Sequence, residues 1–122
     1  MHNNMTMHLA GTTSSKKYFI PYPDPVKLVG AKVGVTTAQA DTASTITIRP
    51  KGATNPVLTA DLQNVDAGAV VKFVVSSSAT AEEIKQLYDD ETPMEMDVNL
   101  STASDLMLNV EFDPFAIAEN PW

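Results

Sequence analysis

The chain has 122 residues, no cysteine, eight basic residues against fifteen acidic ones, and a formal net charge of −7. This length fits one domain with one core, and the lack of cysteine excludes disulfides, thiolate nucleophiles and cysteine-based metal sites. An acidic chain with a single arginine lacks the basic face that nucleic-acid binding needs, and no apolar run approaches the roughly 20 residues that span a membrane.

The charges are distributed unevenly along the chain. Residues 1–61 carry six basic and three acidic side chains, whereas residues 62–122 carry two basic and twelve acidic ones. Two interpretations remain open: an acidic, solubilising surface, or an asymmetry that orients the chain toward its own copies or a partner lattice.

The N-terminal segment is polar and rich in turn-forming residues. Residues 1–17 contain few apolar side chains, which is typical of a flexible arm. Pro21, Pro23 and Pro25 follow and favour an extended, polyproline-like connector. We therefore expect an extended arm and connector at residues 1–25, a folded domain at 26–113, and a C-terminal tail at 114–122.

From Val26 onward, apolar and polar residues alternate with a period of two. The runs 94–100 and 106–112 show this most clearly, and shorter runs lie at 33–35, 46–48, 57–62 and 71–75. Such alternation predicts strands with one buried face, and Gly, Pro, Asn, Asp and Ser clusters separate the runs. The pattern predicts an all-β, antiparallel β-sandwich. Because the Cys…Trp…Cys pattern of immunoglobulin domains is missing, a jelly roll is the preferred topology.

The inward positions of these strands give a predicted core. Its members are Val33, Val35, Ile46, Ile48, Val71, Phe73, Met96, Val98, Leu106, Leu108, Val110 and Phe112.

One segment departs from the period of two. Thr80 and Glu83 have the spacing of a capping box, and Ile84, Leu87 and Tyr88 follow at helical spacing. The sequence therefore predicts one short helix at residues 82–88.

The sequence offers little for catalysis. Its two histidines, His2 and His8, lie in the predicted arm, where no rigid surroundings would hold a catalytic base. No glycine-rich phosphate loop is present, since the five glycines are scattered. The acidic run 89–91 is either a solvated loop or a calcium-binding one. We expect neither enzymatic activity nor a cofactor or metal.

Aromatic and valine residues outside the predicted core indicate contacts with other molecules. Aromatic side chains gather in the two terminal segments, and the run 70–75 is apolar on both faces apart from Lys72. Such residues are typical interface anchors, although the terminal segments could also fold back on their own sandwich. The predicted partner-binding residues are Tyr18, Phe19, Tyr22, Val70, Val74, Phe115 and Trp122.

Together these features resemble a small bacteriophage capsid decoration (cement) protein of the jelly-roll type. The resemblance spans residues 20–115. It rests on the Pro-rich entry at 20–26, the Thr- and Ala-rich strands at 30–49, 58–62 and 69–75, and the late strand pair at 94–100 and 106–112, closed by Asp113, Pro114 and Phe115.

The resemblance implies a non-enzymatic sandwich that assembles with its own copies, often as trimers. Such proteins bind the major capsid protein on the outer surface of an icosahedral head, where terminal arms reach across neighbouring subunits. The expected location is the virion, after synthesis in the host cytoplasm.

Three other functions remain open. A carbohydrate- or receptor-binding module of a phage tail fibre predicts exposed stacking aromatics or a calcium loop. A minor tail or connector protein predicts a ring assembly. A hydrolase predicts activity that depends on Asp89 or Glu95.

Overall fold

The computed structural model describes residues 3–12, 16–22, 24–40 and 43–113. In chain order the elements are β1 (Asn3–Thr12), β2 (Lys16–Ile20), β3 (Val26–Val35), β4 (Thr45–Pro50), β5 (Leu58–Asp61), β6 (Val70–Lys72), β7 (Val74–Val75), α1 (Ala81–Ile84), β8 (Leu87–Tyr88), β9 (Met94–Asn99) and β10 (Ser104–Asp113).

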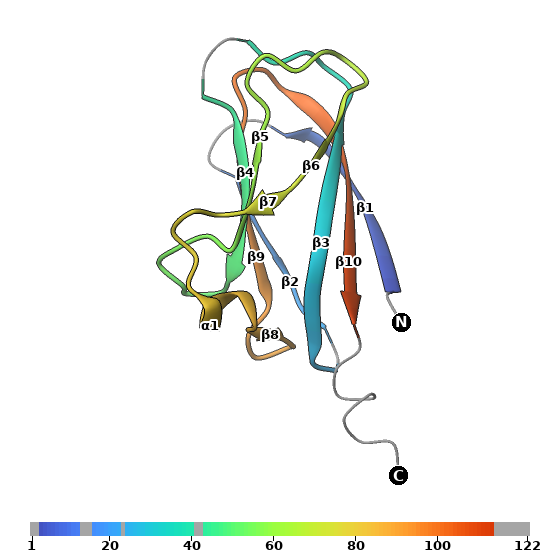
Figure 1. The fold of residues 1–122 in the computed structure, drawn as a ribbon. Helices are drawn as coiled ribbons and strands as arrows, with labels where there is room; N and C mark the ends of the chain where they lie inside the picture. Colours follow the sequence, from blue (N-terminus) through green and yellow to red (C-terminus); the bar gives the residue numbers. More distant parts are fainter. Residues whose placement is uncertain (1–2, 13–15, 23, 41–42, 114–122) are drawn as a thin grey trace.

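The strands form two antiparallel sheets that pack face to face (Figure 1). The first sheet has the order β1-β10-β3-β6, with β8 paired to the start of β3, and the second has the order β2-β9-β4-β5-β7. Without the two-residue strands β7 and β8, the eight remaining strands follow the orders 1-8-3-6 and 2-7-4-5. This is the double Greek-key arrangement of a jelly roll, so the predicted all-β sandwich is confirmed.

The core lies between the sheets and follows from the alternation. In β4, for example, Ile46 and Ile48 are fully buried, whereas Thr45, Thr47 and Arg49 lie on the outer face. Ten of the twelve predicted core residues are buried, and Val71 and Phe112 are half-buried at its margin. The buried apolar residues that the prediction omitted are Tyr22, Val26, Ala31, Val57, Leu58, Ala60, Leu62, Tyr88, Met94 and Leu100.

The boundary predicted between an N-terminal arm and the sandwich at residue 25 is wrong. β1 pairs with β10 from Asn3 opposite Phe112 to Leu9 opposite Leu106, and β2 pairs with β9. The sandwich therefore includes residues from Asn3 onward. Low hydrophobicity suffices here because both strands lie at sheet edges, where the inward side chains of β1 are only half-buried. The predicted tail at 114–122 lies outside the described residues.

The predicted helix is shorter than expected. Its capping box is present: the Glu83 N–H donates to Thr80 Oγ1 at 3.2 Å, and the Thr80 N–H donates to Glu83 Oε1 at 2.9 Å. The helix nevertheless ends at Ile84, because Leu87 and Tyr88 pair with β3 as strand β8. Tyr88 is thereby buried in the core, which a continued helix would prevent.

Candidate functional site

The structure places the predicted partner-binding residues in different surroundings. Val70, Val74 and Phe19 are 68%, 64% and 49% exposed, so these side chains are available for contacts. Tyr18 is half-buried. Tyr22 is only 5% exposed and packs against Phe112 with ring centroids 5.4 Å apart, so it serves the core rather than an outer contact. Phe115 and Trp122 lie outside the described residues.

Val70 and Val74 lie in different sheets. The chain crosses from β6 to β7 at Phe73, which is buried and points into the core. Val70 is paired with Gly34 of the first sheet, and Val74 is paired with Thr59 of the second. The apolar run 70–75 is therefore divided between the two sheets, and Val70 belongs to the outer surface of the first one.

That surface is the outer face of the first sheet, and one cross-strand row on it is apolar. Met107, Gly34 and Val70 are direct neighbours across β10, β3 and β6. Met107 is 47% exposed. A Cβ atom added at Gly34 would lie 3.8 Å from Val70 Cγ2 and 4.0 Å from Met107 Cβ, so the glycine leaves a flat gap between two exposed apolar side chains.

The next row on this face is polar and basic. Asn109, Lys32 and Lys72 are direct neighbours on the same three strands, and Asn109 Nδ2 donates to Thr6 Oγ1 of β1 at 3.0 Å. Like charges directly opposite one another destabilise a sheet. Lys32 and Lys72 form no ion pair with any of the described residues. The protein therefore maintains two adjacent positive charges on an otherwise acidic chain, at a small cost in stability.

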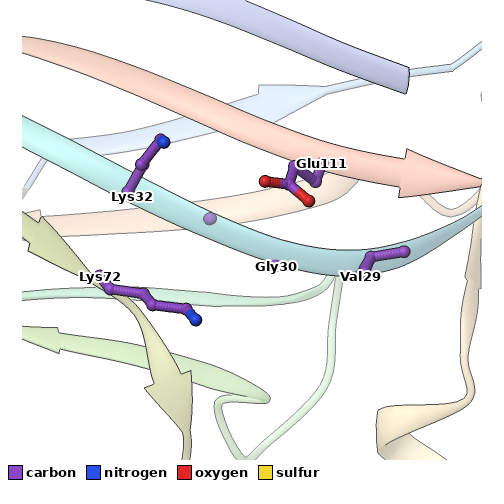
Figure 2. Close-up of a pocket in the computed structure, with 6 residues that line it drawn as sticks. Val29, Gly30, Lys32, Lys72 and Glu111 are labelled. Carbon is purple, nitrogen blue, oxygen red and sulfur yellow. The ribbon is translucent and has the colours of Figure 1, made fainter. Parts of the chain in front are cut away.

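A shallow pocket of about 290 Å³ lies beside this basic row. Figure 2 shows its lining: Val29, Gly30 and Lys32 along β3, Lys72 on β6 and Glu111 on β10. The register shifts between Glu111 and Phe112, and this bulge leaves Val29 42% exposed. A Cβ atom added at Gly30 would have no atom within 4 Å. A side chain at residue 30 would therefore extend into open space beside the other lining residues.

We name the two rows and the pocket together the first-sheet face; its residues are Val29, Gly30, Lys32, Gly34, Val70, Lys72, Met107, Asn109 and Glu111. It combines exposed apolar side chains, two adjacent lysines and a shallow pocket. Sequence reasoning found Val70 but missed the lysines and glycines, because only the strand register brings them together.

The outer face of the second sheet is dominated by a charge network. Glu95, only 7% exposed, lies between Arg49 and Lys17: the Arg49 Nε is 3.6 Å and the Lys17 Nζ 4.0 Å from Glu95 Oε2. Arg49 Nη2 also lies 3.2 Å from Asp97 Oδ2, and Arg49 Nη1 donates to the Thr54 carbonyl at 3.0 Å. These partners fix the two carboxylates in place.

The acidic loop at residues 89–91 has a structural role. Asp89 Oδ1 accepts hydrogen bonds from the Glu91 N–H at 3.0 Å and the Thr92 N–H at 2.7 Å. Among the residues that the structure describes, no group of three His, Cys, Asp or Glu side chains could hold a metal ion. Within the same residues, no helix is long and apolar enough to cross a membrane.

The sequence matches no model of a protein family and no curated protein.

Proposed function

We propose that the protein is a non-enzymatic structural protein of a virion, which decorates and stabilises an icosahedral phage capsid by bridging subunits of the major capsid protein. The observation that carries the proposal is the first-sheet face on a rigid jelly roll. Jelly rolls are frequent in capsid-forming proteins, although the fold alone does not determine function.

The first-sheet face suits a large, rigid partner. Exposed Val70 and Met107 can be buried against an apolar area, and the adjacent Lys32 and Lys72 can pair with carboxylates of the partner. A contact of this kind removes the repulsion between the two lysines, so part of the binding energy comes from strain already present in the free chain.

Stabilisation of a shell follows from preferential binding. A protein that binds assembled subunits across a seam, and not the separated ones, shifts the equilibrium toward the assembled state. The sandwich contributes a rigid body, so little conformational entropy is lost when it binds.

The test is binding to empty shells that are assembled from the major capsid protein encoded in the same genome. Gly30→Gln places a long, uncharged side chain in the pocket opposite Glu111, where nothing lies within 4 Å of its Cβ atom, so the fold should be unaffected. We expect this variant, and Lys32→Glu/Lys72→Glu, to weaken co-sedimentation with shells by about tenfold or more.

A matched control makes the same two lysine-to-glutamate changes outside the first-sheet face. Lys16→Glu/Lys85→Glu reverses two exposed lysines outside the first-sheet face and should bind shells like the unchanged protein. The unchanged protein should also raise the temperature at which shells disrupt. Absence of binding by the unchanged protein, or equal binding by all variants, would contradict the proposal.

A carbohydrate-binding module of a tail fibre is the alternative, and one observation favours it. Phe19 is 49% exposed on the second sheet, its Cα register position is opposite Glu95, and Lys51 Nζ lies 5.8 Å from its ring centroid. It ranks second because Glu95 and Asp97 are already paired with Arg49, and because Phe19 is the one largely exposed aromatic side chain among the described residues. Glycan-array binding that Phe19→Ala abolishes would favour it.

A further inference from the structure

The four strands that end the sheets differ in how far they are protected against pairing with another chain. β1 and β6 end the first sheet, and β2 and β7 end the second. β6 and β7 are three and two residues long, and β2 has five residues with Lys16 and Lys17 among them. Short length and lysine side chains are the usual protection of an edge strand.

β1 has neither protection. It is ten residues long and contains no Asp, Glu, Lys, Arg or Pro. It pairs with β10 on one side, and among the described residues no strand pairs with its other side. Figure 1 shows β1 as the outermost strand of its sheet. Its outer side therefore presents a row of backbone N–H and C=O groups that can accept a further strand.

The side chains of β1 are arranged so that an added strand would gain apolar contacts. Met5, Met7 and Leu9 pack against the core but remain half-buried, because the sheet ends at this strand. Asn4, Thr6 and His8 are exposed on the opposite, outer face. A further strand with the same alternation would cover the methionine row and extend the polar outer face.

We propose that two copies of this chain pair through β1, antiparallel and about a twofold axis, so that their first sheets form one continuous sheet. In an antiparallel pair, directly opposite residues lie on the same face. With Met7 opposite the Met7 of the second copy, Met5 lies opposite Leu9 and Thr6 lies opposite His8. The inward apolar side chains of β1 then continue into those of the second copy across the axis, and the outward polar side chains do the same.

A second copy can occupy this edge without charge repulsion, even though each chain carries −7. β1 contributes no like-charged pair to the interface. The nearest acidic residues of that sheet, Asp105 and Glu111, lie on β10, one strand farther from the axis. Three strand spacings, roughly 14 Å, would separate them from their equivalents in the second copy, and salt at physiological strength screens charges beyond about 8 Å.

The pairing is independent of the proposed function, since it concerns the isolated protein. It would place two first-sheet faces on one continuous sheet, and two docking faces on one particle bind a lattice more strongly than one. Failure to bind shells would leave the pairing intact, and a monomeric protein could still bind shells.

Sedimentation equilibrium of the full chain, from micromolar to millimolar concentration, tests the pairing. We expect a reversible monomer–dimer equilibrium. Thr6→Lys/His8→Lys brings lysines opposite lysines and should yield monomer, whereas Thr6→Glu/His8→Lys brings opposite charges together and should restore the dimer. Both positions are exposed, and the substitutions remove only the 3.0 Å hydrogen bond from Asn109 Nδ2 to Thr6 Oγ1 and the 4.0 Å contact between His8 and Asp105, so the melting temperature should change little. Asn99→Lys, on an exposed position of the second sheet, is the control and should dimerise normally.

Hydrogen exchange supplies a second readout that does not depend on substitution. Amides of β1 should become more protected as concentration rises, whereas amides of the other sheet's edge strand β2 should not. A protein that is monomeric at millimolar concentration, a dimer that persists in Thr6→Lys/His8→Lys, or protection confined to β2 would overturn the proposal.

Discussion

Gln39 and Thr102 are joined by two reciprocal hydrogen bonds: Gln39 Nε2 donates to the Thr102 carbonyl at 3.0 Å, and the Thr102 N–H donates to Gln39 Oε1 at 3.1 Å. Gln39 is 5% exposed, and its amide also donates to the Thr37 carbonyl and accepts from Ser101 Oγ. Both donors and both acceptor positions of the amide are therefore used. This one side chain connects the segment after β3 to the turn between β9 and β10.

Gln39→Ala should lower the free energy of unfolding by about 2–4 kcal/mol. The substitution leaves several backbone groups at this end of the sandwich without their partner, and each such group costs roughly 1–3 kcal/mol when it stays buried. Urea denaturation measures the loss. Gln86→Ala is the matched control, because Gln86 is exposed and its amide makes one bond of 3.3 Å to the adjacent Leu87 carbonyl. Equal stability of the two variants would contradict this role of Gln39.

Tyr22 and Tyr88 are buried at the opposite end of the sandwich, and neither hydroxyl has a hydrogen-bond partner within the part of the chain that the structure describes. Burial raises the pKa of Tyr22 from 10.0 to about 12. Burial, together with the charge of a Tyr22 phenolate, raises the pKa of Tyr88 further. Above pH 10, the unfolded chain therefore loses tyrosine protons that the folded chain retains.

This difference predicts that stability falls as the pH rises above 10. The folded state then binds more protons than the unfolded state, so each tyrosine lowers the free energy of unfolding by up to about 1.4 kcal/mol per pH unit. Tyr88→Phe removes one such group and a hydroxyl without a partner. We expect unchanged or slightly higher stability at neutral pH and a shallower alkaline loss, both measured by urea denaturation. An alkaline loss as steep as that of the unchanged protein would contradict the assignment.

The sequence predicted the strands of the expected domain and missed β1 and β2, which lie in the segment that it assigned to an arm and connector. β9 and β10 follow the alternation along their length. β1 has the same alternation at Met5, Met7 and Leu9, but its polar neighbours resemble a flexible arm. The helix was predicted too long because local spacing cannot show that Leu87 and Tyr88 pair with β3.

The candidate site was less accessible to sequence reasoning. The exposure of Val70 could be predicted because the run 70–75 is apolar on both faces, and only one face of a strand can point into the core. Lys32 and Lys72 are forty positions apart in the sequence, and only the register between β3 and β6 makes them neighbours. No local sequence pattern indicates the register shift between Glu111 and Phe112, which exposes Val29 beside Gly30.

Phe73→Ala should destabilise the protein strongly, whereas Val74→Ala should not. Phe73 is 4% exposed where the chain crosses between the sheets, and its N–H donates to the Ala31 carbonyl at 2.9 Å. Removing the ring leaves a cavity and costs about 3–5 kcal/mol. Val74 is 64% exposed, and surface truncations usually stay within about 0.5 kcal/mol. Thermal unfolding of both variants measures the contrast, and a mild effect of Phe73→Ala would show that the crossing is not anchored there.

The last prediction concerns the charge network on the second sheet. Glu95 is 7% exposed and has two cationic partners, Arg49 at 3.6 Å and Lys17 at 4.0 Å. Lys17 is largely exposed, with 61% of its side chain accessible, so solvent screens its charge and Arg49 is the stronger partner. The buried carboxylate therefore depends chiefly on Arg49.

Arg49→Gln should lower the free energy of unfolding by about 3–5 kcal/mol, because it leaves a buried carboxylate without its main cation. Arg49→Gln/Glu95→Gln removes both charges, and its stability should lie above that of the single variant. The double variant should be the more stable of the two because most of the stability lost in Arg49→Gln comes from the unpaired, desolvated charge of Glu95, and not from the lost attraction itself. Lys17→Gln, at the exposed end of the network, should cost less than about 1 kcal/mol. Urea denaturation of the four proteins provides the comparison, and a double variant less stable than Arg49→Gln would show that the carboxylate is stabilised by other groups.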